Sequence, residues 1–75
     1  MAYFKDLDKG IRSAIKEEKV HFDTGKKDIQ IGFIDYGDEA EFTVSSCAEL
    51  IEVWTGFCKE NGLDPNNIDY VTSRY

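Results

Sequence analysis

The sequence has few of the residues that build metal and catalytic centres. Its 75 residues include one histidine, His21, and two cysteines, Cys47 and Cys58. Zinc sites need three or four such ligands at characteristic spacings. Both cysteines also fall on the apolar side of a predicted helix, where a buried thiol is unreactive. We therefore expect no metal, no cofactor and no enzymatic activity.

Long apolar runs are also missing. The uninterrupted apolar stretches are only a few residues long, whereas a membrane-spanning helix needs about 20 such residues. The opening residues MAYFKDLDKG lack the apolar segment of a signal peptide. We expect a cytoplasmic protein without a membrane partner, in which Cys47 and Cys58 remain thiols rather than form a disulfide.

Cations are absent from the middle of the chain. Residues 1–27 carry seven Lys or Arg and five Asp or Glu, whereas residues 28–75 carry two against ten. Between Asp28 and Cys58 there are seven carboxylates and no Lys or Arg. Phosphate binding depends on cations, so this part of the chain predicts no direct contact with nucleic acid. It favours a protein partner with a basic surface.

Apolar periodicity predicts two helices in one small domain, 1–75. The first has an apolar face made by Phe4, Leu7, Ile11, Ala14 and Ile15. The second has an apolar stripe made by Cys47, Leu50, Ile51, Trp54, Phe57 and Cys58. Ser46 and Glu49 fit a capping box at its start, and Gly62 fits a left-handed stop at its end.

Alternating apolar residues predict strands between these helices. Val20 and Phe22 indicate a short strand, DIQIGFIDY (28–36) a second, and residues 39–44 a third, with a tight turn at Gly37-Asp38. The predicted fold is α+β, a three-stranded antiparallel meander flanked by an N-terminal and a C-terminal helix (α-β-β-β-α). Asp64-Pro65 begins a turn, after which IDYV (68–71) can form a short final strand.

The predicted hairpin GFIDYGDEAEFTV (32–44) concentrates carboxylates. Its alternation assigns Phe33, Ala40, Phe42 and Val44 to the core and leaves the other side to water. One interpretation is a solvated acidic surface. The other is a partner-binding patch, in which charges steer a partner and apolar groups anchor it. The residues of that patch are Ile34, Asp35, Tyr36, Asp38, Glu39 and Glu41.

The order of the predicted elements resembles that of small acidic phage-encoded inhibitors. The segments that carry the resemblance are FKDLDKGIRSAI, DYGDEAEF and CAELIEVWTGFCKEN. Anti-CRISPR proteins of this α-β-β-β-α type block a Cas nuclease by mimicking DNA. The resemblance implies that Asp35, Asp38, Glu39 and Glu41 stand in for phosphates, and that the protein acts in the host cytoplasm. The basic first helix departs from this pattern.

Two functions therefore remain as hypotheses. The first is an inhibitor or regulator that docks its acidic sheet face on a basic site of a nucleic-acid-handling protein. The second is a small interaction or assembly module that dimerises or docks through a sheet edge or an apolar face. Binding that weakens steeply with salt favours the first, and salt-insensitive association favours the second. The chain is expected to be a monomer or a homodimer.

Overall fold

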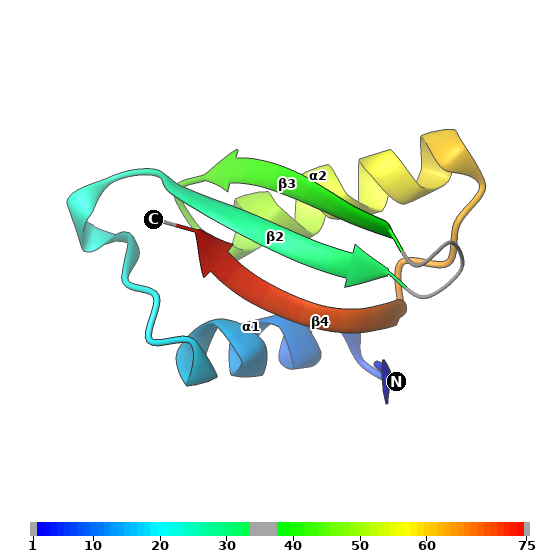
Figure 1. Ribbon diagram of the computed structural model, residues 1–75, viewed down its shortest axis with the longest axis horizontal. Coiled ribbons are helices and arrows are strands. Elements are labelled where there is room, and N and C mark those ends of the chain that lie inside the picture. Colours follow the sequence, from blue (N-terminus) through cyan, green and yellow to red (C-terminus); the bar gives the residue numbers. More distant parts are fainter. Residues whose placement is uncertain (1, 34–37, 75) are drawn as a thin grey trace.

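The chain folds into an antiparallel sheet backed by two helices (Figure 1). The computed structural model describes residues 2–33 and 38–74. The elements are β1 (Ala2–Tyr3), α1 (Leu7–Glu17), the 3-10 helix η1 (Phe22–Thr24), β2 (Lys27–Phe33), β3 (Asp38–Val44), α2 (Cys47–Asn61) and β4 (Asn67–Arg74). Within the described residues the strands lie in the order β1-β4-β2-β3. In Figure 1, α2 passes behind β3, and α1 lies beside β4.

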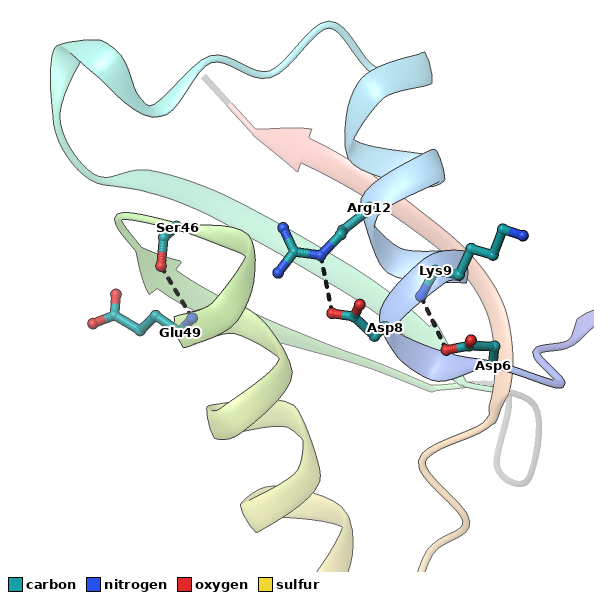
Figure 2. Close-up of polar contacts among 6 residues, drawn as sticks. All are labelled: Asp6, Asp8, Lys9, Arg12, Ser46 and Glu49. Atoms are coloured by element: carbon teal, nitrogen blue, oxygen red, sulfur yellow. Dashed lines mark hydrogen bonds and ion pairs between the residues drawn. The ribbon is translucent and has the colours of Figure 1, made fainter.

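Helix α1 has both an N-terminal capping residue and an apolar face that packs on the core. The side chain of Asp6 accepts a hydrogen bond from the backbone N–H of Lys9 at 3.2 Å (Figure 2), which satisfies a donor that the helix itself leaves unpaired. Ile11 and Ile15 are buried, as the sequence predicts. Gly10 makes room for the ring of Phe4, because a Cβ at this position would lie 2.4 Å from that ring.

Helix α2 has the predicted signals at both ends, with one difference. The backbone N–H of Glu49 donates to Ser46 Oγ at 3.1 Å (Figure 2). The Glu49 carboxylate returns to the backbone N–H of Ser45 at 2.8 Å, one residue before the partner of a capping box. Gly62 ends the helix in the left-handed region, with φ 67°. The backbone N–H of the following Leu63 then donates to the carbonyl of Cys58.

The core lies between the two helices and one face of the sheet. Its buried members are Ile11, Ile15, Ile29, Ile31, Phe33, Val44, Leu50, Trp54, Cys58, Ile68 and Val71. Four aromatic rings, those of Phe33, Phe42, Trp54 and Phe57, pack together with centroids 5.8–6.2 Å apart. Such ring pairs add stability beyond their buried area. The apolar stripe predicted for α2 is confirmed, and Cys47 and Cys58 are both thiols. No helix in the described part of the chain is long and apolar enough to cross a membrane.

The strand predicted at Val20 and Phe22 is wrong. Phe22 begins the 3-10 helix η1, preceded by His21, which is exposed. Val20 and Phe22 are both half-buried against the core. Two apolar residues separated by one polar residue therefore indicated burial correctly, but so short a pattern does not distinguish a strand from a tight turn.

The predicted order of elements is also wrong, although the α+β class and the antiparallel pairing are confirmed. If the two-residue β1 is set aside, the order is α-β-β-α-β. Strand β4 is longer than the predicted IDYV, and it pairs with β2 in the interior of the sheet. The segment after α2 therefore forms an inner strand of the sheet.

The prediction that Asp38 lies in a tight turn is wrong. Asp38 already belongs to β3, where it pairs with Phe33 at the end of β2. The prediction for Gly37 lies outside the described residues, as do those for Ile34, Asp35 and Tyr36. The register of β2 and β3 keeps Ile29 opposite Phe42 and Ile31 opposite Ala40, so their core-facing sides agree with the predicted alternation.

Candidate binding face

The side of the sheet that faces away from the helices is the candidate functional surface. We name it the open face. Its side chains come from alternate positions of three strands: Asp28, Gln30 and Gly32 of β2, Glu39, Glu41 and Thr43 of β3, and Tyr70 and Thr72 of β4. Cross-strand hydrogen bonds between these side chains place them on one surface. The opposite positions of the same strands supply the core.

Tyr70 lies across the centre of this face. It reaches from β4 over Gly32 of β2, and its hydroxyl donates a hydrogen bond of 2.5 Å to Glu39 Oε2 on β3. A Cβ at position 32 would lie 2.1 Å from the Tyr70 ring. The contact between β4 and β3, the two neighbours of β2, therefore exists because β2 has no side chain at this point.

A shift in register sets the direction in which Tyr70 points. Gly32 pairs with Tyr70, but the next residue, Phe33, pairs with Ile68, so Asp69 is an extra residue on β4. This irregularity is a β-bulge. It allows Ile68 and Val71 both to face the core, although they are three residues apart. Tyr70 is consequently turned outward, with 43% of its surface exposed.

Two carboxylates of the open face accept hydrogen bonds from uncharged groups. Glu39 accepts from the Tyr70 hydroxyl, and Glu41 accepts from the Gln30 amide at 3.2 Å. A phenol and an amide orient a carboxylate without neutralising it. At the far end of the face, Asp28 accepts from the Thr43 hydroxyl at 2.7 Å. Neutral donors thus hold all three carboxylates.

The described side chains of the open face include three carboxylates and no ammonium or guanidinium group. Arg74 is the residue opposite Asp28 in the β2–β4 ladder. Glu39 and Glu41 lie two residues apart on β3, the strand at one edge of the sheet, and both are exposed. Glu39 and Glu41 therefore place two negative charges on the β3 side of the face, and the carboxylate of Glu18 accepts from Thr72 on the β4 side at 3.4 Å.

The structure brings together two of the six predicted patch residues. Glu39 and Glu41 share the open face, as the alternation predicts. Asp38 is exposed, but its position in β3 alternates with theirs, and its side chain accepts a hydrogen bond from the Glu39 N–H at 3.1 Å. Asp38 therefore lies at the rim of the open face, at the start of β3. Ile34, Asp35 and Tyr36 lie outside the described residues.

The predicted patch did not include the centre of the face, which Gly32 and Tyr70 form. One signal was available, since a glycine inside a strand pattern often marks a close approach of another group. The identity of that group was hidden, because simple alternation along IDYV puts Tyr70 on the same side as Ile68. The bulge at Asp69 reverses that assignment.

The residues considered as candidate metal ligands or catalytic groups do not lie together. Among residues 2–33 and 38–74, no group of three or more His, Cys, Asp and Glu side chains is placed to hold a metal ion. His21 is exposed beside η1, whereas Cys58 is fully buried in the core. Cys47 is half-buried at the first position of α2.

The hydrogen bond between Tyr70 and Glu39 can be followed by titration. The pKa of the Tyr70 phenol is raised above its ordinary value, first by this bond, then by desolvation and by the negative charges of Glu39 and Asp69. The phenol therefore stays protonated at neutral pH, and the bond is lost as pH rises through the raised pKa. We expect Glu39→Gln to lower the pKa of Tyr70 toward about 10.

Phenolate absorbance measures this shift, with a Tyr70→Phe chain subtracted to isolate the one tyrosine. Gly32→Ala is expected to give the same downward shift, because the added methyl group displaces the ring from its place over β2. The exposed ring can swing into water, so the free energy of unfolding should change by no more than about 1 kcal/mol. A Tyr70 pKa that neither substitution moves would contradict the described contact.

Comparison of the chain with protein-family models, with curated proteins and with solved structures finds no significant match.

Proposed function

We propose that the protein is a non-enzymatic inhibitor or regulator whose open face docks on a basic site of a nucleic-acid-handling protein. In this proposal it acts in a cytosol, as a DNA mimic of the phage-encoded, anti-CRISPR kind. Glu39 and Glu41 occupy subsites that otherwise receive phosphates, and Asp38 adds charge at the rim.

One observation carries the proposal: uncharged donors fix the carboxylates of the open face in place. An acidic surface that serves only to keep a protein dissolved can be mobile and mixed with lysine. Here the Tyr70 hydroxyl donates to Glu39 and the Gln30 amide donates to Glu41, so both carboxylates are oriented by uncharged side chains. Groups that are ordered before binding lose less entropy when a partner orders them.

The spacing of the carboxylates also supports phosphate mimicry. Residues two apart on a strand are separated by about 6.6 Å along it, similar to the separation of consecutive phosphates on one nucleic-acid strand. Glu39 and Glu41 have this relationship on β3. A row of cations that receives a phosphate backbone can therefore receive this pair.

Charge reversal on the face tests the proposal. We expect the immobilised protein to capture a partner from a lysate of the cell in which it acts. Short double-stranded DNA and raised salt should both displace that partner. In the double variant Glu39→Lys/Glu41→Lys, capture should fall at least tenfold, because two attractive charges become repulsive.

Glu52→Lys/Glu60→Lys is the matched control. Glu52 and Glu60 are exposed on α2, so the change in net charge is the same while the open face is left intact. This control should bind as the unmodified protein does. Capture that survives reversal at Glu39 and Glu41, or that DNA fails to displace, would refute the proposal and favour the alternative of an assembly module.

A further inference from the structure

We propose that Tyr70 is the docking point for an arginine side chain of the partner, whose guanidinium stacks on the exposed face of the ring. This inference rests on the proposed function, since it names the chemistry of the basic site that the open face fits. It makes Tyr70 the anchor of the interaction, with Glu39 and Glu41 as charges beside it.

The platform is built by three strands together. The ring lies over the backbone of β2 at Gly32, where no side chain intervenes. Its hydroxyl is held by Glu39 at the far side. One face of the ring is thereby covered and its orientation fixed, while 43% of the residue remains open to solvent. A fixed ring loses little conformational freedom when a partner binds.

Tyr70 stands out from the rest of the described surface. Among the residues whose side-chain burial the structure describes, it is the one large hydrophobic residue that is exposed. Exposed aromatic residues at the centre of a polar surface are enriched among the residues that contribute most to binding. Its central position on the sheet, with the carboxylates toward β3, matches that arrangement.

The surroundings of the ring select a cation. A nucleobase could stack on a tyrosine, but its phosphates would meet the carboxylates of Glu39 and Glu41. A cation over the ring is attracted both by the ring face and by these charges. Charge complementarity therefore identifies the occupant as a basic side chain.

The shape of the site selects arginine over lysine. A guanidinium is planar, so it can lie parallel to a ring while its N–H groups point outward in its own plane. The carboxylate of Glu39 is bonded to the phenol oxygen and so lies at the edge of the ring. A stacked guanidinium can reach such an edge with a charge-assisted hydrogen bond. An ammonium is a compact, strongly hydrated charge without this geometry.

Peptides of equal charge test this inference without knowledge of the partner. Hexa-arginine and hexa-lysine are titrated at low salt into the full chain by calorimetry, with the Tyr70 ring signals followed by NMR. We expect hexa-arginine to bind about three- to fivefold more tightly, the size of an exposed cation–π contact. We also expect it to perturb the ring signals of Tyr70.

Two substitutions at the same position separate the ring from its hydroxyl. Tyr70→Leu should remove the preference for arginine, whereas Tyr70→Phe should keep most of it. Circular dichroism should show that both variants are folded, because the substituted side chain is exposed. Glu52→Gln/Glu60→Gln, which removes two charges from α2, should leave the preference unchanged.

The inference is overturned if hexa-arginine shows no measurable binding or no preference, or if the preference survives Tyr70→Leu. Loss of the preference in Tyr70→Phe as well would assign it to the hydroxyl and would also overturn stacking. Failure of the proposed function is a separate result, because it appears as captured protein that DNA does not displace.

Discussion

A chain that ends at Asn66 is expected to be unfolded. It lacks β4, which lies between β1 and β2 and supplies Ile68 and Val71 to the core. Burial of two such side chains contributes about 3–6 kcal/mol, and each lost ladder hydrogen bond about 0.5–1.5 kcal/mol more. For 75 residues the whole stability is roughly 4–11 kcal/mol.

The measurement is the far-ultraviolet circular dichroism signal and its urea transition, with the dispersion of amide NMR signals as a second readout. A chain in which methionine replaces residues 1–3 is the control, since it lacks only β1, which pairs with two residues of β4. We expect this control to fold, with a loss of about 1–2 kcal/mol. A cooperative transition in the chain that ends at Asn66 would show that β4 is dispensable.

Trp54→Phe is expected to lower the free energy of unfolding by about 2–3 kcal/mol. Trp54 is fully buried at the centre of the aromatic cluster. Its indole N–H donates to the carbonyl of Pro65 at 2.8 Å, which fixes the segment between α2 and β4. The smaller ring leaves a cavity and removes the partner of that carbonyl.

Urea unfolding followed by circular dichroism measures this change, because the substitution removes the only tryptophan. Phe57→Leu is the control, since Phe57 packs in the same cluster but is only half-buried. It should cost about 1 kcal/mol. An equal cost at both positions would show that the hydrogen bond to Pro65 contributes little.

The elements that the sequence predicts well are those whose signals are local. The stripe of α2 recurs over twelve residues, and Ser46 and Gly62 mark the ends of the helix through contacts within a few residues. The face of α1 around Ile11 and Ile15 is equally repetitive. Strand β2 alternates clearly enough to place Ile29 and Ile31 in the core. Such patterns depend on helix and strand periods alone.

The errors occur where one residue changes the phase of a pattern or where distant segments meet. Val20 and Phe22 supply too short a pattern to separate a strand from a 3-10 helix. Asp38 belongs to a strand because Phe33 pairs with it, which propensity does not show. No local sequence pattern indicates that β4 inserts beside β2. Strand order depends on which edges of the sheet the packed helices leave accessible.

The sequence by itself determined the two helices, the alternation of β2 and β3, and the concentration of carboxylates at Glu39 and Glu41. Local periodicity and composition suffice for these properties. Only the tertiary structure decided that β4 lies inside the sheet and that the bulge at Asp69 turns Tyr70 outward. It also joined Tyr70 to Glu39 across Gly32. That contact links residues 31 positions apart, and it exists because the intervening strand has no side chain where the ring crosses.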